Sequence, residues 1–74
     1  MNDNAAIRLE FPRGCDIEHA CAEAVRLGNQ LQCDTVFDFN GVHVHARQGV
    51  DPIALANAWH RELGSPNKRK LAMV

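Results

Sequence analysis

Hydrophobic and polar residues alternate on both sides of Asn40-Gly41, between residues 34 and 47. Alternation with a period of two is typical of strands with one buried face. The Asn-Gly dipeptide favours a type I′ turn, whose two central residues both have positive φ. Because a two-residue loop fixes the register of a hairpin, the pairing can be predicted. The predicted pairs are Phe39 with Val42, Asp38 with His43, Phe37 with Val44, Val36 with His45, Thr35 with Ala46, and Asp34 with Arg47.

This register divides the hairpin into two faces, because successive side chains of a strand point in opposite directions. We expect one face to be buried, and it carries Phe37, Phe39, Val42, Val44 and Ala46. We expect the other to meet solvent, and it carries Asp34, Val36, Asp38, His43, His45 and Arg47. A slip of one residue would exchange the two sets, so the pattern itself specifies the pairing.

Residues 7–11 alternate in the same way and predict a first strand that ends at residues 12–14, Pro-Arg-Gly. Its expected core residues are Ile7, Leu9 and Phe11, with Arg8 and Glu10 facing solvent.

A helix is predicted next, with Asp16 as its N-cap. The inner face repeats every three or four residues and consists of Ile17, Ala20, Cys21, Ala24, Leu27, Gly28 and Leu31. Alternatively, Gly28 ends the helix early as a C-cap, which leaves residues 29–32 as a loop.

The second predicted helix begins at Asp51-Pro52, where an N-cap precedes a proline in the first helical position. Gly64 is the expected C′ residue, and Pro66 prevents continuation. The inner stripe is Leu55, Ala56, Trp59 and Leu63, with Ile53 at its margin. We interpret Trp59, the single tryptophan, as a core residue that packs on Phe37 and Phe39.

The predicted order is therefore β-α-β-β-α in one α+β domain of residues 1–66, followed by a basic, patternless and flexible tail of residues 67–74. A three-stranded sheet with both helices on its apolar face forms a two-layer sandwich. The first strand–helix–strand connection is expected to be right-handed. The opposite side of the sheet, which we call the open face, is the predicted interaction surface and comprises Arg8, Glu10, Asp34, Val36, Asp38, His43, His45 and Arg47.

Composition narrows the function further. A chain of 74 residues has a small core, and its net charge of −1 gives no overall field that attracts nucleic acid or an anionic membrane. The sequence pattern shows no apolar run long enough to span a membrane and no signal peptide. We therefore expect a cytoplasmic protein. The three cysteines lack C-x-x-C spacing and are interpreted as free thiols. We expect no cofactor.

Two groups of residues are candidates for chemistry. His43, His45 and Asp38 share a face and contain metal-ligating atoms, but we interpret them as polar residues on the solvent side of a sheet and predict no metal site. Cys15 and His19 are four residues apart at a helix start, where a thiol is activated. A third orienting group is missing, so we interpret them as an ordinary thiol beside an exposed histidine.

The basic residues Lys68, Arg69 and Lys70 are candidates for phosphate contacts. The open face lacks the stacking aromatic residues of many single-strand binders, and a domain-wide basic surface is missing. Nucleic acid is therefore an unfavoured partner.

The Phe-Asp-Phe-Asn-Gly-Val-His-Val hairpin and the Asp-Pro-Ile-Ala-Leu-Ala-Asn-Ala-Trp helix give the chain a resemblance over residues 34–63. It resembles the short accessory proteins of phages and prophages of Gram-negative bacteria. That resemblance implies proteins that bind and modulate a host or phage protein, including inhibitors of bacterial defence systems. It assigns no functional residue in this chain.

We therefore predict a non-enzymatic protein-binding module, homodimeric, that inhibits or modulates a partner by covering its surface. Uncovered sheet and unprotected strand edges favour such a role. The alternative is a small nucleic-acid-binding regulator that uses Lys68, Arg69 and Lys70. A third hypothesis is a small metal- or thiol-dependent enzyme.

Overall fold

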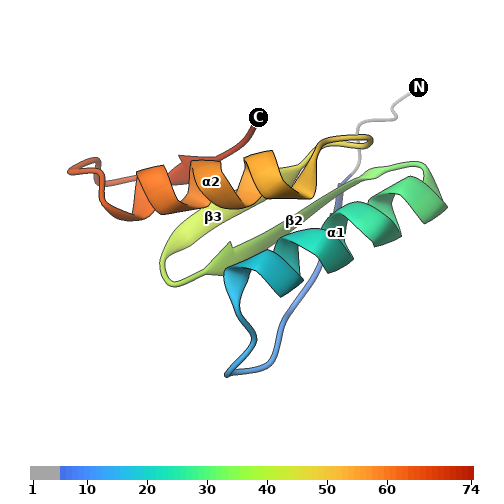
Figure 1. Cartoon of the computed structure of the whole chain (residues 1–74), viewed down its shortest axis with the longest axis horizontal. Coiled ribbons are helices and arrows are strands. Elements are labelled where there is room, and N and C mark those ends of the chain that lie inside the picture. The colour runs from blue at the N-terminus through green and yellow to red at the C-terminus, as the bar shows by residue number, and fades with distance from the viewer. Residues whose placement is uncertain (1–5) are drawn as a thin grey trace.

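The computed structural model describes residues 6–74, and residues 1–5 of the predicted domain lie outside the described part. It is an α+β fold, as predicted, with both helices in front of a sheet in the view of Figure 1. The sheet has four strands and not the three that we predicted. In chain order the elements are β1 (Ala6–Arg8), α1 (Ile17–Leu31), β2 (Asp34–Phe39), β3 (Val42–Ala46), α2 (Pro52–Leu63) and β4 (Leu71–Ala72).

The hairpin of β2 and β3 has the predicted register at every pair from Phe39–Val42 to Thr35–Ala46. Asn40 and Gly41 have φ values of 50° and 79°, the positive φ that a type I′ turn requires. The predicted pair of Asp34 with Arg47 is wrong, because β3 ends at Ala46.

The fourth strand comes from the segment that we predicted to be a patternless tail. Strand β4 pairs in parallel with β3, with His43 opposite Leu71 and Val44 opposite Ala72. The His43 amide donates to the Lys70 carbonyl at 2.9 Å, and the Ala72 side chain is completely buried. Two residues are too few to show an alternating pattern, so the sequence alone could not reveal this strand.

The strand order is β1-β2-β3-β4, with β1 parallel to β2 and antiparallel pairing only in the hairpin. Residues of α1 and α2 share one core with the inner face of the sheet, so both helices lie on the same side. In the sheet, β2 lies next to β1 and β4 lies next to β3, each displaced in the same direction across the sheet. The parallel pair β1–β2 runs opposite to the parallel pair β3–β4, because β2 and β3 are antiparallel. One of the two helical connections is therefore left-handed, which is rare between parallel strands.

Helix α1 begins as predicted, because an Asp16 carboxylate oxygen accepts from the His19 amide at 2.9 Å. It continues to Leu31 and is capped by Gln32, which has a φ of 57°. The alternative end at Gly28 is therefore wrong. A Cβ at Gly28 would lie 2.7 Å from the Cys33 carbonyl oxygen, so this glycine allows the chain to pass closely over the helix.

The inner face of α1 is buried where predicted, except near its end. Ile17, Ala20, Cys21, Ala24 and Gly28 are buried, Leu27 is half-buried, and Val25 joins them. Leu31 is 55% exposed, against our prediction, because the helix extends past the edge of the core. The buried Thr35 hydroxyl donates to the Ala24 carbonyl at 3.0 Å, a contact that small helix residues permit.

Helix α2 begins at Pro52 after the Asp51 N-cap and ends before Gly64, as predicted. Gly64 has a φ of −86°, so it ends the helix without the left-handed conformation of a usual C′ glycine. Leu63, in the last turn of the helix, is 39% exposed, so its predicted place in the inner stripe is wrong.

The core contains a row of aromatic side chains that crosses both layers. Successive ring centroids are 5.0 Å apart for Phe11–Phe37, 6.4 Å for Phe37–Phe39 and 5.5 Å for Phe39–Trp59. Trp59 is buried and its indole nitrogen donates to the Phe39 carbonyl at 3.0 Å, which confirms it as a core residue. Ile7 is 41% exposed, so its predicted core position is wrong: it lies on the edge strand, where β1 has a neighbour on one side only.

The turn can be tested by comparing two glycines. We expect Gly41→Ala to destabilise the protein by about 1–2 kcal/mol, because an L residue is strained at positive φ. Gly64→Ala is the control, since its φ is negative and an added Cβ meets nothing within 4 Å. Chemical denaturation measures both. Equal stability of the two variants would contradict the assigned turn.

Candidate functional site

The open face has the composition that the register predicts. Six of its eight residues lie in strands and point away from the helices, namely Arg8, Asp34, Val36, Asp38, His43 and His45. Glu10 and Arg47 are exposed and lie just beyond the ends of β1 and β3. Sequence reasoning missed Leu71, which stands beside His43 on the same face and is 50% exposed.

The residues that lie directly opposite each other on this face, in β2 and β3, form pairs without backbone hydrogen bonds, the kind with the shorter Cα–Cα distance. The His43 amide donates to the Lys70 carbonyl, directly before β4, so it points away from β2. The pair of Asp38 and His43 therefore exchanges no backbone hydrogen bonds, and neither does the pair of Val36 and His45 two residues further. In such pairs the Cα atoms are about 4.5 Å apart, which brings the side chains together.

Asp38 is the centre of a chain of hydrogen bonds across three strands. Its carboxylate accepts from the Arg8 guanidinium of β1, and its other oxygen lies 2.9 Å from Nδ1 of His43. These hydrogen bonds lower the pKa of Asp38 below its ordinary value, and the bond with Arg8 has the larger effect. All three side chains remain substantially exposed, so the chain stabilises the fold only modestly. Its main effect is to hold the side chains in one arrangement.

Asp34 forms a second hydrogen-bonded pair, with His45, at the far end of the hairpin. One oxygen lies 2.9 Å from Nε2 of His45, and the other accepts from the Gln48 amide at 3.0 Å. Both hydrogen bonds lower the pKa of Asp34, and the bond with His45 has the larger effect. Asp34 therefore fixes the exit of β3 through Gln48 instead of pairing with Arg47.

The two histidines thus belong to separate pairs. Between residues 6 and 74, the structure contains no group of three or more histidine, cysteine or acidic side chains that could hold a metal ion.

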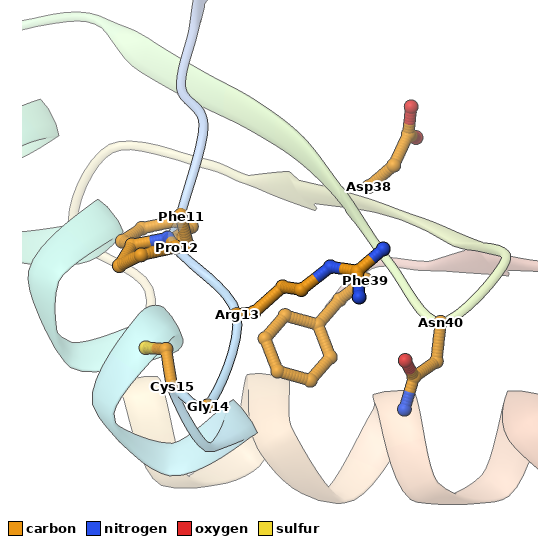
Figure 2. Close-up of a pocket in the computed structure, with 8 residues that line it drawn as sticks. All are labelled: Phe11, Pro12, Arg13, Gly14, Cys15, Asp38, Phe39 and Asn40. Atoms are coloured by element: carbon orange, nitrogen blue, oxygen red, sulfur yellow. The ribbon is translucent and has the colours of Figure 1, made fainter.

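A pocket of about 560 Å³ lies at the hairpin end of the sheet, next to the loop between β1 and α1. Figure 2 shows the Arg13 side chain extended towards the hairpin, beside the ring of Phe39. The residues that line this loop pocket are Phe11, Pro12, Arg13, Gly14, Cys15, Asp38, Phe39 and Asn40.

An adjoining pocket contains the candidate thiol pair. Cys15 and His19 both line it, but the sulfur of Cys15 is directed to the Asp16 carbonyl oxygen, 3.5 Å away. The structure therefore places the two side chains near each other without a hydrogen bond between them. Cys21 is a core residue, as predicted, and burial raises the pKa of its thiol to about 12.

The predicted nucleic-acid residues lie next to the open face. A third pocket, of about 570 Å³, is formed on the other side of the hairpin turn. We call it the basic pocket, and it is lined by Asp38, Gly41, His43, Lys68, Arg69, Lys70 and Leu71. The pairing of β4 with β3 brings these residues together, so their position beside the open face could not be predicted from the sequence pattern.

Comparison with known proteins finds no matching family model, no matching curated protein and no matching solved structure. Within the described chain, neither helix has the length and apolar character needed to cross a lipid bilayer.

The lowered pKa values of Asp34 and Asp38 allow a prediction of how the stability of the fold changes with pH. Since their pKa values are lowered in the folded state, their contribution is present above about pH 4, the ordinary range of an unfolded aspartate, and is lost as the pH falls through the lower folded values. We expect Asp34→Asn with Asp38→Asn to flatten this acid dependence. Thermal unfolding between pH 7 and pH 2 measures it. An equally steep dependence in the double variant would contradict the assigned pairs.

Proposed function

We propose that this protein is a non-enzymatic protein-binding module that modulates or inhibits a partner by covering its surface with the open face. The observation that supports this most strongly is the chain of Arg8, Asp38 and His43 on a side of the sheet that neither helix covers. Side chains that already hold one another in place lose less conformational freedom when a partner binds.

The face offers both kinds of contact that a specific interface uses. Polar groups of three strands can form hydrogen bonds, while Val36 and Leu71 add apolar surface between them. A standard interface buries about 800 Å² on each partner. The protein exposes 4878 Å² in total, so an interface of this size would cover about a sixth of its surface.

The proposal includes a homodimer, a cytoplasmic location and a phage-encoded inhibitor of a host or defence protein. The edge strands β1 and β4 each pair on one side only, so main-chain groups on their other side are available to another chain. Cys15, Cys21 and Cys33 are all free thiols, which is typical of a reducing compartment. The resemblance of residues 34–63 to phage accessory proteins favours the choice of partner.

The proposal is tested with two charge reversals that match each other. Asp38→Lys breaks the ion pair with Arg8 on the open face, and Glu23→Lys breaks a similar pair with Arg26, 2.7 Å long, on the helical layer. Both change the net charge equally. We expect Asp38→Lys to abolish partner capture from host lysate and self-association in sedimentation, because opposed like charges cost several kcal/mol of binding.

Glu23→Lys is expected to bind as the wild type does. Unfolding of each variant by denaturant provides the control for folding, where exposed changes of this kind alter stability by about 0.5 kcal/mol or less. Equal binding by both variants would exclude the open face as the interface. Loss of binding in Glu23→Lys alone would place the interface on the helices.

A further inference from the structure

The basic pocket is part of the folded surface and not of a loose tail. The segment before β4 is fixed at one end by the hydrogen bond from the His43 amide to the Lys70 carbonyl. It is fixed again by the Lys70 ammonium, which donates to the Leu63 carbonyl at the end of α2, at 2.9 Å. Lys68 and Arg69 are therefore held beside the hairpin turn.

Two of the three basic side chains, Lys68 and Arg69, are available to bind an anionic ligand. Lys70 is already engaged with the end of α2. Asp38, the acidic residue in the pocket, is bound by Arg8 and His43 and so is partly neutralised before it meets the cations. Lys68 and Arg69 are exposed and form no ion pair with any residue between 6 and 74. The pocket thus has an excess of positive charge.

We propose that the basic pocket binds the phosphate of a nucleotide. A guanidinium group matches phosphate oxygens in a forked geometry, and an ammonium adds a point charge. Arg69 and Lys68, which are neighbours in the chain and both line the pocket, supply one of each.

The pocket also suits the rest of such a ligand. Leu71 is 50% exposed and gives an apolar surface on which a base or ribose can lie. The volume of about 570 Å³ is within the range of small-molecule sites, about 300–1,000 Å³.

Two kinds of ligand could supply this phosphate, namely a free mononucleotide or one nucleotide unit of a single-stranded nucleic acid. Both present a phosphate with a planar base attached. The basic pocket shares Leu71 with the open face, but phosphate binding does not depend on the protein partner proposed above, because Lys68 and Arg69 are not residues of that face. Asp38 and His43 form the boundary between the basic pocket and the open face.

The test is a titration of the ¹⁵N-labelled protein with adenosine 5′-monophosphate and, separately, with a short oligothymidylate. We expect saturable shifts of the Gly41, His43 and Leu71 amides. Saturation with the mononucleotide assigns the site to free nucleotides, and saturation with the oligonucleotide alone assigns it to nucleic acid. Without saturable shifts at these amides with either probe, the proposal is wrong.

A pair of arginines provides the matched control. Arg69→Ala and Arg61→Ala remove the same side chain and charge from exposed positions, one in the basic pocket and one on α2 outside it. We expect Arg69→Ala to weaken binding, and Lys68→Ala with Arg69→Ala to weaken it by at least about tenfold, through lost charge-assisted hydrogen bonds. Arg61→Ala is expected to have little effect. An equal loss in Arg61→Ala would mean that net charge alone is responsible, and would overturn the proposal.

Discussion

The turn at Asn40-Gly41 is the constraint on which the rest of the structure depends. Positive φ at both residues allows a two-residue loop, and that loop leaves only one register for β2 and β3. With this register every apolar side chain of the hairpin except Val36 faces the helices, while Asp38 and His43 meet on the other side. Core and candidate site are thus two results of one pairing.

The second requirement is a close approach of the two layers. Gly28 lets the chain pass over the end of α1, and the hydroxyl of Thr35 reaches the carbonyl of Ala24. Trp59 then joins α2 to the hairpin through its hydrogen bond with Phe39. Because a chain of this length buries little surface, such contacts have a large share in its stability.

Features determined by neighbouring residues were predictable from the sequence. Both N-caps, Asp16 and Asp51, and the hairpin register depend on local chemistry and were predicted correctly. Where the layers end depends on distant parts of the chain, so the exposure of Leu31 was missed. Strand β4 was missed for the same reason, and with it the position of Lys68 beside the open face.

The most direct test of this account is a measurement of the hairpin register by nuclear Overhauser effects between Hα protons. Pairs without backbone hydrogen bonds bring their Cα atoms to about 4.5 Å. The account predicts strong Hα–Hα effects between Asp38 and His43 and between Val36 and His45. Strong effects displaced by one residue along β3 would contradict it, because Asp38 would then face Val42 and the open face would not exist.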